Sequence, residues 1–250
     1  MKSFLSKIKE LFDFGNLLYY PGCMTHHVLK DIFENYKLIF KKANLDFITL
    51  DSISCCASPA KNMGYKDTHL LQIRRNIDLF KKHGVTKIVT NCPACYHIFK
   101  NNHKHDPAWN FKVYHTTEFI LELLKQNKLK PKTQSPAPDT NCKLITYHDP
   151  CHLGRHSNIY SAPREILKKI GYEIKEMQNN KENSFCCGGG ASLVNNNPEL
   201  ANSIAKKRIQ MAPIKKITTC CPMCYKHLKN NAPFNIEILE LSKVILDALQ

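Results

Sequence analysis

Ten of the twelve cysteines in this 250-residue chain form two copies of one pattern. Each copy contains a single cysteine, an adjacent pair and a Cys-Pro-x-Cys sequence, in that order. The second copy follows the first by 128 residues at the single cysteine and by 131 residues at the adjacent pair. Two loops of separate origin would not keep this spacing, so the chain contains one module twice. The candidate metal ligands are Cys23, Cys55, Cys56, Cys92 and Cys95, then Cys151, Cys186, Cys187, Cys221 and Cys224.

The way these cysteines are used favours metal binding over disulfide bonding. Disulfide frameworks usually belong to short secreted chains, whereas this chain begins Met1-Lys2-Ser3-Phe4 without a long apolar leader segment. A disulfide between adjacent cysteines closes a strained ring, while two adjacent thiolates readily bind neighbouring metal atoms. We therefore expect reduced, metal-loaded cysteines and a cytoplasmic protein.

Composition excludes two classes of function. No stretch approaches the roughly 20 apolar residues that a membrane helix needs, and even the segment from Ile238 to Leu249 contains three charged side chains. The net charge of +15 comes from scattered lysines without a basic and aromatic stripe, so we expect no nucleic-acid partner. A residual basic face would favour an acidic redox partner.

Hydrophobic periodicity predicts alternating strands and helices. In the first half, the expected strands are Leu17 to Tyr20, Phe47 to Leu50 and Lys87 to Thr90, and the expected helices are Val28 to Ala43, Leu70 to Lys82 and Thr116 to Gln126. In the second half, the expected strands are Leu144 to Tyr147 and Lys216 to Thr219, and the expected helices are Arg164 to Ile170, Leu200 to Met211 and Ile238 to Leu249. Right-handed crossovers would gather the carboxyl ends of the strands, and the cysteines that follow them, at one edge. The expected fold is α/β, with two tandem, pseudo-symmetric α/β modules, parallel strands and cysteine clusters at the strand carboxyl ends.

The domain boundaries follow from a polar, proline-containing stretch between Gln126 and Asp139. We expect a first cysteine-rich domain at residues 17–130, a linker at 131–141 and a second cysteine-rich domain at 142–250, each domain with a core of its own. Residues 1–16 form an amphipathic segment that we expect to pack on the protein itself. The alternative is contact with a membrane surface or a partner subunit.

The number of thiolates bears on which metal is bound. A zinc site or a cubane iron-sulfur cluster takes four cysteine ligands, and each half offers a fifth, which favours a larger iron-sulfur cluster. Two alternatives stay open. The chain could be a zinc-stabilised interaction module, or a thioredoxin-like dithiol protein in which each Cys-Pro-x-Cys follows a strand and begins a helix.

Two stretches carry a specific resemblance to a known family: Tyr147-His148-Asp149-Pro150-Cys151-His152-Leu153-Gly154-Arg155 and Cys186-Cys187-Gly188-Gly189-Gly190. From about Tyr19 to Leu249 the chain resembles the cysteine-rich domain (CCG) iron-sulfur family. That family includes one of the subunits of heterodisulfide reductase, its membrane-linked relative and iron-sulfur subunits of glycolate and lactate oxidising systems. The resemblance implies an iron-sulfur oxidoreductase subunit that transfers electrons to or from a disulfide or a flavoprotein partner. It also implies a noncubane [4Fe-4S] cluster on all five cysteines of each half, or zinc in one half.

The sequence also departs from the family pattern and lacks some motifs. Ala57-Ser58-Pro59 follows the first adjacent pair, where the family commonly has glycine. No ferredoxin-type cysteine run is present, so we expect electrons from another chain, either a flavoprotein or a ferredoxin-type iron-sulfur subunit. No Gly-x-Gly-x-x-Gly fingerprint is present, so we expect this chain to bind no flavin or nicotinamide itself.

Further candidates flank the second set of cysteines. His148, His152 and Arg155 would deliver a proton or tune the reduction potential, and the equally weighted alternative is that they cap and orient the loop. Gly188, Gly189 and Gly190 would let the backbone approach sulfur closely, with a flexible turn as the alternative. Cys142 and Cys220 have no counterpart in the repeat, and we interpret them as ordinary cysteines.

Overall fold

The structure is a computed structural model that describes residues 15–132 and 143–250. The expected amphipathic segment up to residue 14, Cys142 and most of the expected linker lie outside the described residues. The first half contains β1 (Asn16–Tyr19), α2 (Gly22–His27), α3 (Lys30–Lys42), α4 (Ser58–Asn62), α5 (Lys66–Lys82), β2 (Val85–Thr90), α6 (Pro93–Asn101), η1 (His103–His105), β3 (Lys112–His115) and α7 (Thr116–Lys125). The second half contains β4 (Lys143–Tyr147), α8 (Ser161–Lys169), β5 (Tyr172–Ile174), η2 (Lys181–Asn183), α9 (Leu193–Asn196), α10 (Pro198–Gln210), β6 (Lys216–Thr219), α11 (Pro222–Asn231), β7 (Glu237–Glu240) and α12 (Leu241–Ala248).

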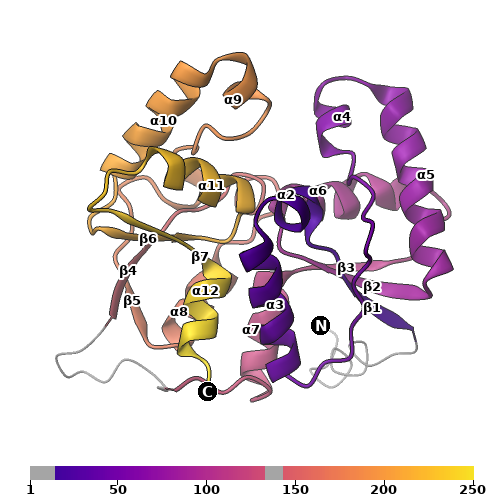
Figure 1. The fold of residues 1–250 in the computed structure, drawn as a ribbon, viewed down its shortest axis with the longest axis horizontal. Coiled ribbons are helices and arrows are strands. Elements are labelled where there is room, and N and C mark those ends of the chain that lie inside the picture. Colours follow the sequence, from indigo (N-terminus) through magenta and orange to yellow (C-terminus); the bar gives the residue numbers. More distant parts are fainter. Residues whose placement is uncertain (1–14, 133–142) are drawn as a thin grey trace.

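Both halves contain a parallel sheet with corresponding strand order (Figure 1). The orders are β1-β2-β3 in the first half and β5-β4-β6-β7 in the second, and every pairing is parallel. In the first half, a single parallel bridge between Leu18 and Ile48 stands where β5 stands in the second. β-branched residues are frequent in β2 and β6, as suits buried parallel strands. The expected fold class is confirmed.

Several expected elements differ from the structure. The predicted strand at Phe47 to Leu50 is reduced to the bridge at Ile48. The predicted helix from Ile238 begins only at Leu241, because the backbone of Glu237–Glu240 pairs with β6 as strand β7. The helix predicted from Val28 begins at Lys30, after the separate short helix α2. The strands β3 and β5 were not predicted, since three or four residues with polar members give too short an alternation to detect.

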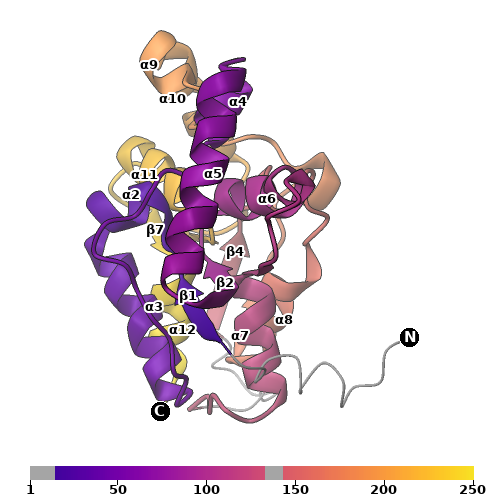
Figure 2. The ribbon, with the colours of Figure 1, turned by 90° about the vertical axis from the view of Figure 1, so that its right-hand side faces the viewer.

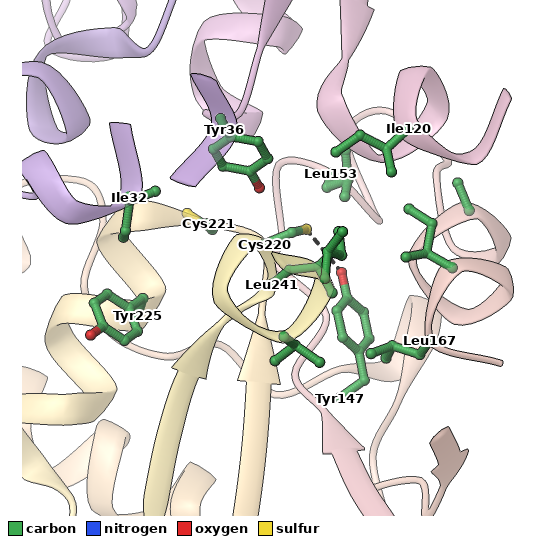
Figure 3. Packing of buried hydrophobic residues seen from close by; sticks show 14 of the residues in the cluster. Ile32, Tyr36, Ile120, Tyr147, Leu153, Leu167, Cys220, Cys221, Tyr225 and Leu241 are labelled. Atoms are coloured by element: carbon green, nitrogen blue, oxygen red, sulfur yellow. Dashed lines mark hydrogen bonds between the residues drawn. The ribbon is translucent and has the colours of Figure 1, made fainter. Parts of the chain in front are cut away.

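The two halves pack together through equivalent helices. Helix α3 of the first half packs on α12, the last helix of the second half (Figure 1). In the same way, α8 of the second half packs on α7, the last helix of the first half. The largest buried hydrophobic cluster draws side chains from both halves (Figure 3), including Ile32, Tyr36, Ile120, Leu153, Leu167 and Leu241. Burial of each such side chain stabilises the fold by about 1.5–3 kcal/mol. The halves therefore share a core, which the sequence analysis did not anticipate.

A buried carboxyl group lies at this interface. The Tyr36 hydroxyl donates to Glu240 Oε1 at 3.0 Å, and the backbone N–H of Ser242 donates to Glu240 Oε2 at 2.7 Å. Tyr36 belongs to the first half and Glu240 to the second, and both side chains are buried. Burial raises the pKa of Glu240 to about 7. The interface therefore holds a carboxyl group that titrates near neutral pH.

A second shared feature is a pair of helical projections. The α4–α5 and α9–α10 segments extend from the two halves on the same side of the molecule (Figure 1 and Figure 2). The Ser192 hydroxyl lies 4.0 Å from the Met63 sulfur, so the two projections approach each other. Among the described residues, no helix combines the length and apolar character needed to cross a membrane.

Replacement of Glu240 by glutamine should remove part of the pH dependence of stability. The folded protein binds the Glu240 proton more tightly than the unfolded chain, so this contribution is present at low pH and is lost as the pH rises from about 4.5 to about 7. Over that interval, wild type should lose about 3 kcal/mol of unfolding free energy relative to Glu240→Gln. Urea unfolding of both proteins at pH 5 and pH 8 measures the difference, and parallel pH profiles would contradict it.

Candidate metal centres

The five repeat cysteines of the first half meet where three loops leave the sheet. Cys23 lies in α2, the Cys55–Cys56 pair precedes α4, and Cys92 and Cys95 flank the start of α6. Hydrogen-bonding contacts link the thiols in the order Cys55, Cys56, Cys95 and Cys92. Cys23 lies close enough to Cys92 and Cys56 for their charges to raise its pKa further, although burial is the larger cause. Four of the thiols thus form a chain of contacts, and Cys23 lies near two of them.

The five repeat cysteines of the second half form a continuous chain of contacts. Thiol hydrogen bonds run from Cys151 through Cys186, Cys187 and Cys224 to Cys221. The Sγ atoms of Cys187 and Cys224 are 3.2 Å apart. Cys187, Cys221 and Cys224 are buried, whereas Cys23 and Cys55 of the first half are exposed. The second centre is thus the more enclosed of the two.

Hydrogen bonds between thiols lower the pKa of one cysteine in each adjacent pair. A hydrogen bond from Cys55, followed by one from Cys95, holds the pKa of Cys56 well below its usual range. In the second half, hydrogen bonds from Cys151 and Cys187 lower the pKa of Cys186. A bound metal takes the place of such shared protons, because sulfur ligands bind metal as thiolates.

The Cys-Pro-x-Cys sequences lie at helix starts. Pro93 and Pro222 are the first residues of α6 and α11, where proline costs no hydrogen bond and its fixed φ suits the helix. The pKa of Cys221 is lowered by a hydrogen bond from the Cys224 thiol and also by backbone N–H groups of the first helical turn. The helix start therefore stabilises negative charge on this sulfur.

Glycines bring the backbone close to the sulfur atoms. Gly22 has a φ of +75°, and a Cβ there would lie 3.0 Å from the Cys95 sulfur. The N–H groups of Gly188 and Gly189 donate to the sulfurs of Cys186 and Cys187, each at 3.4 Å. Gly188 has a φ of +80°, and a Cβ there would lie 2.8 Å from a backbone oxygen, whereas Gly190 has open space around it. Of the three glycines proposed from the sequence, the first two lie against sulfur.

The predicted residue His148 lies beside the second thiol group. Its Nδ1 accepts a hydrogen bond from Arg208 Nε at 3.0 Å, and its buried Nε2 has no hydrogen-bond partner among the described residues. A ring nitrogen of His148 and the sulfurs of Cys187 and Cys224 all lie within 4.8 Å of one another. Burial lowers the pKa of His148 to about 3, so the ring is neutral. This imidazole therefore lies beside the two sulfur atoms.

His152 lies between the two halves. Its Nδ1 is 3.4 Å from the Cys151 sulfur, and its ring centroid is 4.9 Å from that of His156 and 6.0 Å from that of His97, which belongs to the first half. Burial lowers the pKa of His152 to about 4, against the opposing charges of Cys186 and Cys56. Cysteines of both centres therefore act on this ring.

The remaining predicted residue, Arg155, orients a loop. Its exposed guanidinium donates from Nη1 to the backbone oxygen of Ser184, two residues before Cys186.

In both halves, a tyrosine hydroxyl contacts the residue that precedes the Cys-Pro-x-Cys sequence. The Tyr147 hydroxyl lies 3.0 Å from the Cys220 sulfur (Figure 3), and the Tyr19 hydroxyl donates to Asn91 Oδ1 at 3.1 Å. Cys220 is fully buried and belongs to the core.

Sequence reasoning missed Arg208, His97 and His156. Arg208 carries a detectable signal, because it shares one buried face of α10 with Ala201 and Ala205, where a charged residue is unexpected. The contact of His97 with His156, at a centroid separation of 5.5 Å, joins residues of different halves. No local pattern in the sequence predicts such a contact.

The donor set fits a metal cluster bound through sulfur. Each half gathers five thiols, backbone N–H groups point at two of the sulfurs of the second half, and a buried imidazole nitrogen there has no partner among the described residues. Soft thiolate ligands suit iron-sulfur clusters and zinc. The fold and this donor set define a protein with two cysteine-lined candidate metal sites in one chain.

Comparison with known proteins places the chain in a family. The family description "Cysteine-rich domain" matches residues 17–100 and 145–229, so this chain belongs to the cysteine-rich domain family. It is 30% identical over 251 residues to the EtfAB:quinone oxidoreductase of Syntrophomonas wolfei, covering 93% of this chain and 34% of that protein. It is 28% identical over 253 residues to one subunit of the dihydromethanophenazine:CoB–CoM heterodisulfide reductase of Methanosarcina acetivorans, covering 96% of this chain and 60% of that protein.

A third relative shares a higher identity over a shorter stretch. The probable iron-sulfur-binding oxidoreductase FadF of Bacillus subtilis is 41% identical over 154 residues, covering 60% of this chain and 21% of that protein. The chain thus spans between about one fifth and three fifths of the length of these three relatives.

Alanine at Gly188 should destabilise the second centre, while alanine at Gly190 should not. A Cβ at Gly188 meets a backbone oxygen at 2.8 Å and forces an L-residue into a left-handed conformation, at a cost of about 1–3 kcal/mol. Gly190→Ala is the matched control and should stay within about 0.5 kcal/mol of wild type. Urea unfolding and metal content of both variants check this expectation. Equal losses in the two variants would show that the turn geometry is not what matters.

Proposed function

We propose that this chain is an iron-sulfur oxidoreductase subunit of heterodisulfide-reductase type, with a noncubane [4Fe-4S] cluster in each half. The gathering of five thiols in each half is the observation that carries this proposal. A zinc site or a cubane cluster would use only four of them. The proposed ligands are Cys23, Cys55, Cys56, Cys92 and Cys95, then Cys151, Cys186, Cys187, Cys221 and Cys224.

Such a cluster accepts and releases single electrons. The protein supplies the thiolates, the N–H groups of Gly188 and Gly189 that stabilise sulfur charge, and a shared core that fixes the two centres relative to each other. His152 lies within reach of the charges of both centres. This arrangement suits a reaction in which one substrate takes two electrons, as a disulfide does when it becomes two thiols.

The electron partner is a second polypeptide in this proposal. We favour a flavoprotein or a ferredoxin-type iron-sulfur subunit, in line with the names of the relatives, which include EtfAB and a heterodisulfide reductase. The net charge of +15 favours an acidic partner surface. The reduced thiols that ligation requires favour the cytoplasm.

The wild-type chain, purified without oxygen, should contain about eight irons and eight acid-labile sulfides. Cys221→Ser should lower both to about four, because it removes one ligand of the second centre. Cys220→Ser is the matched control, since the Cys220 sulfur faces the Tyr147 hydroxyl and serine keeps a hydrogen-bonding group there. Iron and sulfide analysis of the three proteins, with EPR spectra, makes the measurement.

Stoichiometric zinc without sulfide would contradict this function and support the zinc-stabilised alternative. Four irons and one zinc in wild type would limit the cluster to one half. With clusters present, reoxidation of the reduced protein by an organic disulfide supports disulfide chemistry, whereas reoxidation by a flavoprotein alone assigns the chain to electron relay.

A further inference from the structure

We propose that His148 and Arg208 act as a pair that donates an N–H hydrogen bond to the centre of the second half and raises its reduction potential above that of the first. This inference rests on the proposed iron-sulfur function and goes beyond it, because it makes the two centres unequal and gives electrons a direction within the chain.

The hydrogen bond between the two residues fixes the tautomer of His148. A guanidinium has only N–H donors, so Arg208 Nε donates and His148 Nδ1 accepts, at 3.0 Å. Nδ1 therefore carries no proton, and the proton of the neutral ring is on Nε2. A charged ring would place two N–H groups against each other, so this hydrogen bond requires the neutral form.

The Nε2–H group needs a partner that the polypeptide does not supply. His148 is 1% exposed, and its Nε2 makes no hydrogen bond among the described residues. An unpaired buried donor costs about 1–3 kcal/mol, so such a group is kept where something accepts from it. The ring lies beside the sulfurs of Cys187 and Cys224. Sulfur of the bound group is thus the acceptor, and a protonated nitrogen has no lone pair with which to bind metal.

Arg208 adds a buried positive charge. Its side chain is fully buried, and it donates to Asn179 O at 2.7 Å and Ser184 Oγ at 3.2 Å as well as to His148. The nearby carboxylate of Asp149 is engaged by Arg164 at 2.7 and 2.8 Å. The Arg208 charge therefore acts on the thiolates through a medium of low dielectric constant. A positive charge and an N–H donor both favour the reduced, more negative state of a cluster.

The first half lacks this pair among the described residues. The repeat places Tyr20 where the second half has His148, and the Tyr20 hydroxyl donates its proton to the backbone oxygen of Ser54. Within residues 15–132 and 143–250, the buried arginines are Arg164 and Arg208, both in the second half. The buried ring of His103 in the first half has no hydrogen-bond partner at either nitrogen among the described residues, so no arginine is bonded to it as Arg208 is to His148.

Redox titration of the full chain, followed by EPR, tests the inference. Relative to wild type, His148→Leu should lower the reduction potential of the higher-potential centre by at least about 59 mV, which makes its one-electron reduction tenfold less favourable. The potential of the other centre should not change. Tyr20→Phe is the matched control in the first half and should shift neither centre. His148→Gln, which has both an acceptor for Arg208 and an N–H donor, should recover most of the loss.

A structural role alone would not reproduce these shifts. If the second centre of His148→Leu contains no cluster, Arg208→Gln is the alternative variant. It keeps an N–H donor to His148 Nδ1, removes the positive charge and should lower the reduction potential of the second centre. In wild type, the signal of an exchangeable proton coupled to the cluster should disappear in deuterium oxide. Evidence of a ring nitrogen bound directly to metal would overturn the inference. Two clusters with unshifted potentials in His148→Leu or Arg208→Gln would also overturn it and leave the proposed function standing. The absence of any iron-sulfur signal in wild type would overturn both.

Discussion

The packing of each half on the closing helix of the other determines the rest of the structure. Helix α3 lies on α12 and α7 lies on α8, and the cluster between them draws side chains from both halves. Because the strands of each sheet are parallel, their carboxyl ends lie on one edge, and this packing brings the two edges together. The loop of His152 then contacts His97 of the first half, and the cysteine groups of both halves influence one imidazole.

The duplication gives the two centres a common plan and different surroundings. A tyrosine at the end of the first strand bonds to the residue before each Cys-Pro-x-Cys, through Asn91 in one half and Cys220 in the other. The second centre is more enclosed and has His148 and Arg208 beside it, whereas the first is more open and has Tyr20. Charge and hydrogen bonding around a cluster set its potential, so equal ligands do not imply equal centres.

The sequence predicts those features that depend on local pattern. The cysteine spacing indicated the repeat, and the expected strand ends placed the thiols correctly, because a parallel α/β topology leaves few arrangements. The shared core was missed, since the contact of α3 with α12 joins segments about 200 residues apart. The residues of β7 were assigned to a helix because Ile238 and Leu241 fit helical spacing. They form a strand because their backbone pairs with β6, which the local sequence does not reveal. Arg208 was missed because its importance depends on the burial of one face of α10.

The central proposal is that this chain holds two sulfur-ligated centres, one on each side of the shared interface, that are coupled to each other. The most direct measurement is the EPR spectrum of the fully reduced wild-type chain, compared with that of Cys221→Ser. We predict signals split or broadened by magnetic coupling between the two centres, and a simple uncoupled signal once the second centre is lost. A wild-type spectrum equal to the sum of two isolated centres would contradict the claim.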